Sequence, residues 1–366
     1  MEQAIDRAPP AAMTMTHPTI AAGAPAIRTA GLTKVYGARA VVDDLNLAVP
    51  QGTICGFLGP NGAGKSTTIK MLLGLIGATR GTASLFGLDA GKDSLEIRRR
   101  VGYLAQEARF YEHMTARETL RFVARVYFRG PAAGIERRIE EMIELVGLEG
   151  KADRPVRGFS GGEKQRLGLA QAALPAPDLL ILDEPVSALD PLGRRDVLSI
   201  MERLRGQTTI FYSTHILDDV QRVSDTVVIL HNGRLVAQGP IGTLLGTEGT
   251  VYTLTVAGDG RATRARLASL PFVGGVTEAQ GHDDEEATTT LEVTVSDPPE
   301  ARRELLRAVL ADGTTEVVAF GPKRFNLEDI FVSLIEGHGA PRESGGAAGH
   351  GPASERDARG GQSDGR

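Results

Sequence analysis

The chain has 366 residues, of which 41% are hydrophobic and 24% charged, a composition typical of globular proteins and a length that suits roughly two domains. Its net charge of -5 excludes the basic footprint of a nucleic-acid-binding protein, so no nucleic-acid partner is expected. Cys55 is the only cysteine, which excludes an internal disulfide, fits a reducing compartment and predicts a small buried residue in its strand.

The N-terminal part combines a loose leader with short β-type segments. Residues 1–25 are rich in Ala, Pro and Thr without periodicity, which predicts a disordered leader. Two strand-like segments then lie between Ile27 and Val49, on either side of Tyr36. Alone, Tyr36 would be a half-buried strand aromatic. Ahead of the phosphate-binding loop described next, it could instead stack on an adenine ring.

A glycine-rich loop joins a strand to a helix. The loop reads Gly-x4-Gly-Lys-Ser, the P-loop pattern, and comprises Gly59, Pro60, Asn61, Gly62, Ala63, Gly64, Lys65 and Ser66. It lies between an apolar run, Thr53–Leu58, and a helical pattern, Thr67–Ile76. The glycines let backbone N–H groups face one anion, toward which the helix points its positive end. Lys65 supplies a charge for the β- and γ-phosphates, and Ser66 a hydroxyl ligand for Mg²⁺.

A simple glycine turn capping a helix is the alternative interpretation of this loop. The bare pattern should arise by chance in a chain of this length with odds on the order of one per cent. The flanking strand and helix patterns disfavour the alternative further.

The segment after the P-loop helix is predicted to be mainly helical. A strand near Thr82–Phe86, an Arg-rich helix near Leu95–Arg100 and a strand Val101–Leu104, followed by Gln106, come first. Thr115-x-x-Glu118 is a capping box that opens a helix to about Phe128. Apolar residues at helical spacing from Ile135 to Val146 predict a second helix. The middle of the chain therefore forms a helical insert.

Ser160, Gly161, Gly162 and Glu163 open the next predicted helix. Ser160 with Glu163 forms another capping box, which for an isolated segment is the simpler interpretation. Two glycines behind a serine at a helix start also form an anion-binding nest. The two interpretations are compatible.

Two acids follow the buried run Leu179–Leu182. The pattern is typical of a parallel strand that delivers carboxylates at its C-terminal edge, although solvated loop acids are the alternative. In a P-loop protein, Asp183 would be an outer ligand of Mg²⁺ and Glu184 would face the attacking water. Ser187–Asp190 and a helix to about Leu204 come next. His215 follows the β-run Thr208–Ser213, and a histidine there can reach a γ-phosphate, although a lone histidine is more often structural.

The chain then changes character beyond residue 246. A hairpin over residues 227–237 completes the alternation of strands and helices that predicts an open α/β sheet with helices on its faces. Segments between 252 and 320 follow the order β-α-β-β-α-β, which suggests a small ferredoxin-like or similar α+β module. A terminal helix from Phe325 to Phe331, with Asn326 as N-cap, precedes a tail over 337–366 predicted to be disordered. No apolar run reaches the length of a membrane span and no secretion signal is present, so a cytoplasmic chain is expected.

These segments resemble the ATP-binding subunit of ABC transporters, with the family's motifs in the family's order. The resemblance covers about Ile27 to Gly239. It implies a P-loop NTPase fold with a RecA-like core, an antiparallel β subdomain and a helical subdomain near 107–175, within a domain over 26–246. Residues 247–336 would form an accessory α+β domain. The matching positions are Tyr36 for the adenine-stacking aromatic, Gly59–Ser66 with Thr67 for Walker A, Gln106 for the Mg²⁺- and partner-sensing glutamine, Ser160–Glu163 for the signature, Leu179–Asp183 for Walker B, Glu184 for the catalytic carboxylate, Ser187–Asp190 for the D-loop and His215 for the switch histidine.

The resemblance also implies cofactors and partners. ATP and Mg²⁺ would bind, and the signature of one copy would contact ATP on the P-loop of a second copy, so hydrolysis would need a homodimer. The signature reads Phe-Ser-Gly-Gly-Glu where Leu-Ser-Gly-Gly-Gln is commonest, which leaves the role of Glu163 open. Residues 66–74 and 326–331 resemble ATPase subunits of ABC-2 type exporters. Such subunits pair with a separate membrane permease on the inner face of the cell membrane.

Two other functions compete with this interpretation. A soluble, non-transport cassette ATPase is the main rival, although translation factors of the superfamily carry two cassettes and only one P-loop is present here. DNA-repair relatives insert a long coiled coil that this sequence lacks. A P-loop kinase of another class would leave Ser160–Glu163 and His215 unexplained. Co-purification of a multi-span membrane protein would separate the transport subunit from both.

Overall fold

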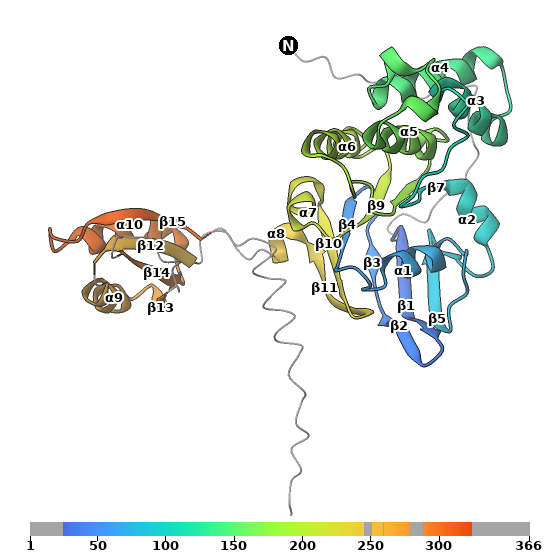
Figure 1. The fold of residues 1–366 in the computed structure, drawn as a ribbon. Helices are drawn as coiled ribbons and strands as arrows, with labels where there is room; N and C mark the ends of the chain where they lie inside the picture. Colours follow the sequence, from blue (N-terminus) through green and yellow to red (C-terminus); the bar gives the residue numbers. More distant parts are fainter. Residues whose placement is uncertain (1–24, 245–250, 259, 279–287, 324–366) are drawn as a thin grey trace, which may run out of the picture.

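The structure is a computed structural model of the chain and describes residues 25–244, 251–258, 260–278 and 288–323. The predicted leader, apart from Pro25, the predicted helix from Phe325 to Phe331 and the predicted tail from 337 onward lie outside the described residues. Helices and strands before residue 245 form one group, and those after residue 250 form a second. Figure 1 labels the elements of both groups.

A six-stranded sheet lies at the centre of the first group. Its strands, in spatial order β11-β10-β4-β9-β8-β7, are β11 (Arg234–Pro240), β10 (Thr226–His231), β4 (Ile54–Leu58), β9 (Thr209–Thr214), β8 (Leu179–Leu182) and β7 (Val101–Leu104). All neighbours are parallel except β11, which pairs antiparallel with β10. Every residue of β4, β8 and β9 is buried, as expected of parallel strands covered on both faces. The predicted open α/β sheet is thus confirmed.

Helices and a second sheet cover the two faces of this central sheet. The helices are α1 (Lys65–Leu72), α2 (Ser94–Arg100), α5 (Gly161–Ala173), α6 (Pro191–Arg203), α7 (Leu217–Val223) and α8 (Ile241–Leu244). Successive residues of β4 alternate between two cores: Ile54 packs in the core that includes α5, α6 and α7, and Cys55 in the core that includes α1 and α2. Burial raises the pKa of the Cys55 thiol to about 12. This confirms the expected buried position of Cys55, and the raised pKa disfavours the reactive thiolate.

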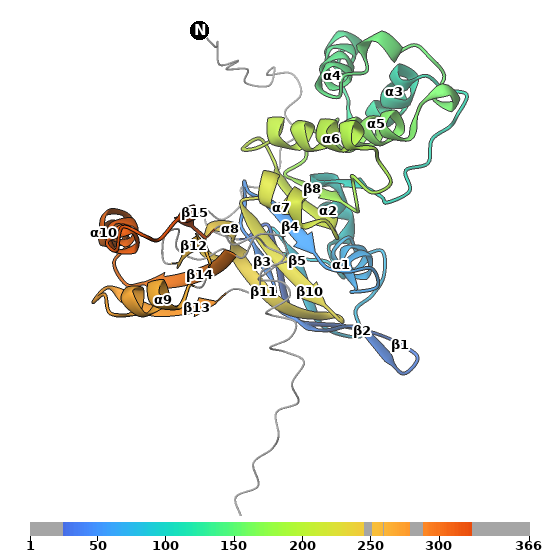
Figure 2. The same ribbon diagram turned by 60° about the vertical axis from the view of Figure 1, so that its left-hand side comes forward.

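The second sheet is antiparallel and contributes to the core around α1. It has the order β2-β1-β5-β6, with β3 also paired to β1. Its strands are β1 (Ile27–Tyr36), β2 (Arg39–Leu45), β3 (Ala48–Val49), β5 (Arg80–Leu85) and β6 (Leu88–Asp89). In both ribbon views this sheet and the helices α3 to α5 lie at opposite ends of the group, with the six-stranded sheet between them (Figures 1 and 2).

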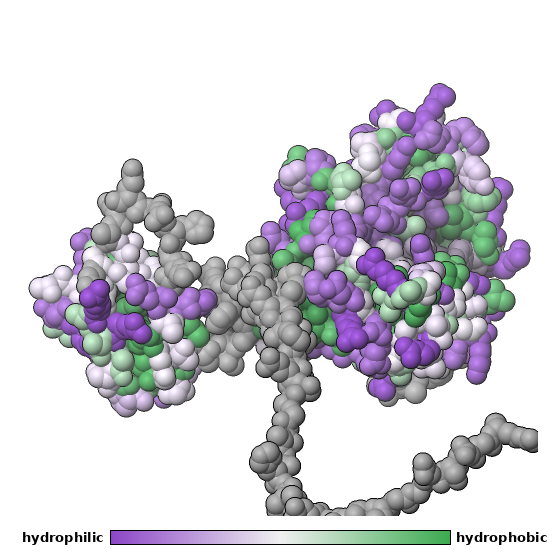
Figure 3. All heavy atoms as spheres, turned by 60° about the horizontal axis from the view of Figure 1, so that its bottom comes forward, coloured by the Kyte–Doolittle hydropathy of each residue, from purple (hydrophilic) through white to green (hydrophobic). Residues whose placement is uncertain are grey.

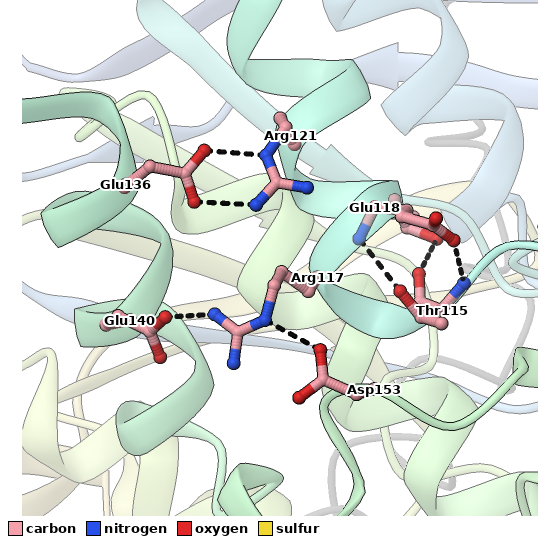
Figure 4. Close-up of polar contacts among 8 residues, drawn as sticks. Thr115, Arg117, Glu118, Arg121, Glu136, Glu140 and Asp153 are labelled. Carbon is pink, nitrogen blue, oxygen red and sulfur yellow. Dashed lines mark hydrogen bonds and ion pairs between the residues drawn. The ribbon is translucent and has the colours of Figure 1, made fainter. Parts of the chain in front are cut away.

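The middle of the chain forms the predicted helical insert. It contains α3 (Ala116–Tyr127), α4 (Ala132–Leu145) and two short 3-10 turns, η1 (Glu149–Lys151) and η2 (Val156–Gly158), before α5. The predicted capping box is present: Thr115 Oγ1 accepts from the Glu118 N–H, and Glu118 accepts from the Thr115 N–H. Arg121 donates two hydrogen bonds to Glu136, which holds α3 against α4 (Figure 4).

The second group has the order predicted for a ferredoxin-like module. Its elements are β12 (Val251–Ala257), α9 (Arg261–Ala268), β13 (Val273–Glu278), β14 (Thr288–Val295), α10 (Pro298–Leu310) and β15 (Val317–Pro322). The strands form an antiparallel sheet in the order β13-β14-β12-β15. Leu254, Leu267 and Leu305 join one face of this sheet and both helices into a separate apolar core.

Element bounds differ from the predicted ones mainly after the P-loop. The helix predicted over Thr67–Ile76 runs instead from Lys65 to Leu72, because the Gly74 N–H bonds to the Met71 carbonyl and closes the last turn.

None of the helices in the described part of the chain has the length and apolar character needed to span a bilayer. Hydrophilic residues cover much of the surface shown in Figure 3, with hydrophobic patches scattered among them.

Candidate nucleotide-binding site

The P-loop lies at the C-terminal end of β4 and is held tightly by neighbouring backbone. Two glycines make close approaches that no side chain would allow. A Cβ at Gly59 would lie 2.4 Å from the Leu230 carbonyl oxygen, and one at Gly64 would lie 2.6 Å from the Val41 carbonyl oxygen. Gly64 also has φ 104°, outside the region open to residues with a side chain. The glycine pattern therefore reflects this backbone geometry, and Pro60, Asn61 and Gly62 form its exposed rim.

Lys65 begins α1 and points back into the loop. Its side chain is buried, and Nζ donates to the Gly59 carbonyl at 2.6 Å and to the Pro60 carbonyl at 3.1 Å. Nζ also lies 3.5 Å from Glu184 Oε1. Burial lowers the pKa of Lys65, while the charges of Glu184 and Asp183 oppose that shift. Ser66 and Thr67 follow in the first turn and are half-buried.

Asp183 connects the P-loop helix to two strands. Its Oδ1 accepts from Ser66 Oγ at 3.1 Å and from Ser213 Oγ at 2.6 Å, and its N–H donates to the Leu104 carbonyl. Mg²⁺ usually takes one or two protein oxygen ligands and keeps several waters, so a serine hydroxyl beside a carboxylate is a fitting pair of metal ligands. Within the described ranges no cluster of three or more His, Cys, Asp and Glu side chains forms a metal cage.

Glu184 is the point at which four elements meet. Its carboxylate accepts a long hydrogen bond from Gln106 Nε2 at 3.4 Å and lies 3.8 Å from His215 Nδ1, in addition to the Lys65 contact. Its backbone has φ 49°, an uncommon conformation for a residue with a side chain, of the kind that often marks functional sites. The Glu184 N–H donates to Ser213 Oγ at 2.9 Å. The predicted catalytic residues thus converge.

Ser213 bonds both acids and was not predicted from the sequence as a site residue. Ser213 lies in β9, which pairs parallel with β8 so that Tyr212 faces Leu182. This register brings the Ser213 hydroxyl to Asp183 and Glu184. The only sequence signal is its place as the last residue of an apolar run that ends two residues before His215.

Among the described residues, Tyr36, Ser160 and Asp190 make no hydrogen bond or ion pair with Lys65, Asp183 or Glu184. Tyr36, at the end of β1, is 51% exposed, and Lys34 Nζ lies 5.1 Å from the centre of its ring. Ser160 and Gly161 are exposed at the start of α5. Asp190 is exposed at the start of α6 and makes no side-chain capping bond. In both ribbon views α5 lies apart from α1 (Figures 1 and 2).

The signature forms the predicted capping box. Ser160 Oγ accepts from the Glu163 N–H at 3.2 Å, and Glu163 Oε2 accepts from the Ser160 N–H at 2.9 Å. Glu163 Oε1 also makes an ion pair with Lys151. Burial would raise the pKa of Glu163, but the hydrogen bonds from Lys151 and from the Ser160 N–H outweigh it and lower the pKa.

Strand, glycine loop, helix start and paired acids together define a nucleotide-binding protein of the P-loop class. The sequence model of the family described as ABC transporter matches residues 42–187. The bacitracin transport ATP-binding protein BcrA of Bacillus licheniformis is 45% identical over 218 residues, which cover 58% of this chain and 69% of that protein. The daunorubicin/doxorubicin resistance ATP-binding protein DrrA of Streptomyces peucetius is 37% identical over 322 residues, which cover 87% of this chain and 94% of that protein.

Solved structures agree with this assignment. One described as the ATP-binding subunit of an ABC transporter aligns with a TM-score of 0.54 at 35% identity, covering 60% of this chain and 91% of that chain. A dimeric ATP-binding cassette in a post-hydrolysis state, bound to ADP and Pi, aligns with a TM-score of 0.54 at 22% identity, covering 59% and 98%. This second likeness shows the fold alone. The chain belongs to the ABC transporter family, and within it is an ATP-binding subunit that hydrolyses ATP.

Proposed function

We propose that two copies of this chain close around Mg²⁺-ATP and thereby drive a separate membrane permease of an ABC-2 type exporter. The observation that carries this proposal is the placement of the signature. Ser160 and Gly161 present the positive end of a 13-residue helix to solvent, on a part of the chain away from its own P-loop. An exposed helix start with free N–H groups suits a phosphate brought by a second copy.

The residues around the P-loop would then divide the chemistry. Mg²⁺, held by Ser66 and Asp183, would neutralise charge on the β- and γ-phosphates. Lys65 would cradle the same phosphates. Glu184, already within reach of Lys65 and His215, would orient the attacking water and accept its proton, and His215 would contact the γ-phosphate. Tyr36 would stack on the adenine, and Asp190 would face the second copy.

A mixing experiment tests the shared site. Lys65→Ala removes the phosphate lysine of one copy, and Ser160→Arg blocks the signature of the other. In a mixed pair, one of the two composite sites keeps both an intact lysine and an intact serine. We therefore expect ATPase activity to return on mixing two inactive variants. No recovery from folded variants that still associate would contradict the two-copy site.

The proposed permease surface lies on α3 and the loop that follows Gln106. A hollow of about 430 Å³ is lined by His113, Met114, Glu118, Arg121, Phe122 and Arg125. Phe122 is 48% exposed and packs edge to face with Tyr111 at 5.9 Å between ring centres. The capping box at Thr115 and the ion pairs of Arg117 and Arg121 hold this surface rigid (Figure 4). An exposed aromatic pair beside a cation suits a partner segment with apolar and acidic side chains.

Co-purification with a co-expressed permease tests this surface. Phe122→Ala with Arg125→Glu should lower recovery of the permease about tenfold or more, because aromatic and arginine anchors dominate interfaces. Arg137→Glu on α4, also an exposed arginine, is the matched control and should bind normally. Equal recovery of the permease with the unsubstituted chain, the double variant and the control would place the permease elsewhere.

The comparisons favour export over a non-transport role. Relatives are named for bacitracin transport, for daunorubicin/doxorubicin resistance and, in Ralstonia nicotianae, for Nod factor export. The compounds in these names differ from one another, although the ATP-binding subunits are similar in sequence to this chain. We therefore propose that the permease, and not this chain, selects the exported compound. The chain would work on the inner face of the cell membrane. We also propose that residues 26–246 form the ATPase domain and residues 247–336 an accessory assembly or regulatory domain.

A further inference from the structure

Glu163 places a nearly buried carboxylate at the start of the signature helix. Its side chain is 10% exposed, and both of its oxygens are engaged. Oε2 accepts from the Ser160 N–H, and Oε1 pairs with Lys151. The carboxylate thus sits one hydrogen bond from the residue that opens the proposed phosphate-binding surface.

A negative charge at this point opposes the binding of a phosphate. Like charges a few ångströms apart repel, and the repulsion grows where water is partly excluded. The capping geometry itself does not need the charge, because a glutamine at the third helical position caps in the same way. With glutamate there, the helix start keeps its attraction for an anion only if a cation neutralises the carboxylate.

Lys151 supplies that cation from a separate element. It is the last residue of η1, and its N–H bond to the Leu148 carbonyl at 2.9 Å fixes the turn. Arg166, the other cation that acts on Glu163, directs its Nη1 elsewhere: this atom donates to the Val146 carbonyl at 3.1 Å and lies 3.9 Å from Asp196. Lys151 is therefore the main partner of this carboxylate.

We propose that Lys151 is a positioning residue for ATP-driven closure: it neutralises Glu163, so that Ser160, Gly161 and Gly162 can receive the terminal phosphate of ATP bound to a second copy. This assignment rests on the proposed two-copy site. It also gives Glu163 a defined role, as one half of a charge pair that substitutes for a neutral capping residue.

The test measures ATP-dependent association of the full chain rather than turnover. In a Glu184→Gln background, sedimentation velocity gives the ATP concentration, with Mg²⁺, at which half of the protein is dimeric. The Lys151 side chain is 43% exposed and that of Glu163 10%. Removal of the counter-ion by Lys151→Ala should therefore raise that concentration about three- to fivefold, the upper end of the range for exposed ion pairs. Lys151→Arg keeps the positive charge and should give the same half-point as the parent.

Lys164 offers a matched control. It is adjacent to Glu163 on the same helix, but its ammonium pairs with Glu112, whose side chain is 65% exposed. Lys164→Ala removes the same charge from the chain and should shift the half-point by less than about twofold. In a Glu163→Gln background, Lys151→Ala should also have no effect, because no charge remains to neutralise.

The outcomes separate this proposal from the proposed function. A parent that never dimerises with ATP overturns the two-copy site and this assignment with it. If the parent dimerises and Lys151→Ala matches it, only the assignment is overturned. Equal shifts from Lys151→Ala and Lys164→Ala, or a shift that persists with Glu163→Gln, would also overturn it. Binding of a fluorescent ATP analogue to monomeric Lys151→Ala, and to Lys151→Gln as a second variant, confirms that each protein is folded.

Discussion

Three glycines of the P-loop separate backbone strain from steric overlap. Gly62 has φ 80°, yet a Cβ there would meet nothing within 4 Å. Gly59 lacks a left-handed φ, but its Cβ would lie 2.4 Å from the Leu230 carbonyl oxygen. Gly64 combines φ 104° with a Cβ 2.6 Å from the Val41 carbonyl oxygen. Alanine at these three positions should therefore have three different costs.

The expected costs follow from the two effects. Gly62→Ala forces alanine into a left-handed backbone, which costs about 1–2 kcal/mol of unfolding free energy. Gly59→Ala must displace backbone, which typically costs about 1–3 kcal/mol. Gly64→Ala adds the two, or about 2–5 kcal/mol, a large part of the roughly 5–15 kcal/mol that stabilises a native protein.

Urea unfolding, followed by far-ultraviolet circular dichroism, measures these differences. Titration with a fluorescent ATP analogue measures the loop directly. Gly62→Ala should still bind nucleotide, because its N–H is unchanged, whereas Gly64→Ala should lose binding. Equal destabilisation by Gly62→Ala and Gly64→Ala would refute the steric argument, because both share the strain and only one has the overlap.

Four further predictions concern Glu184, the Arg194–Asp219 pair and the C-terminal region. Glu184→Gln should retain ATP and lower turnover about 100-fold or more, measured by phosphate release; full activity would remove Glu184 from its role. Arg194→Ala should cost about 3 kcal/mol in urea unfolding, because Arg194 Nε pairs at 2.6 Å with buried Asp219. Burial raises the pKa of Asp219, so between the ordinary and the raised pKa the folded state binds more protons than the unfolded state. The free energy of unfolding should therefore fall as the pH rises through that window. Asp219→Asn should abolish this fall. Truncation after residue 246 should leave binding of the ATP analogue unchanged; its loss would contradict an accessory role.

Local chemistry explains which parts of the fold could be predicted from the sequence. Both capping boxes, at Thr115 and Ser160, were confirmed, because each joins groups only three residues apart. The P-loop was predictable because its own residues supply both the turn and the helix start. The end of α1 was wrong, because a continuing apolar pattern does not show that Gly74 closes the last turn.

Contacts between distant segments could not be derived in this way. Ser213 reaches Asp183 only because β9 lies next to β8, and strand order is not a local property. The pair of Lys151 and Glu163 depends on how η1 packs against α5, and other basic residues of this chain also have a glutamate at a similar separation. Such pairs require the assembled core before their partners can be named.

The contacts of Glu184 would link hydrolysis to the proposed permease surface. Gln106 bonds this carboxylate at 3.4 Å, near the limit for a hydrogen bond, so small changes at the γ-phosphate can break it. Gln106 belongs to the segment between Leu104 and Thr115, which is anchored at both ends. At its start the Leu104 carbonyl accepts from the Asp183 N–H at 2.8 Å, and at its end Thr115 forms the capping box. We infer that movement on hydrolysis is confined to residues between these anchors. Tyr111, which packs on Phe122, lies within that segment, so a change at the carboxylate would reach the proposed permease surface through this ring contact.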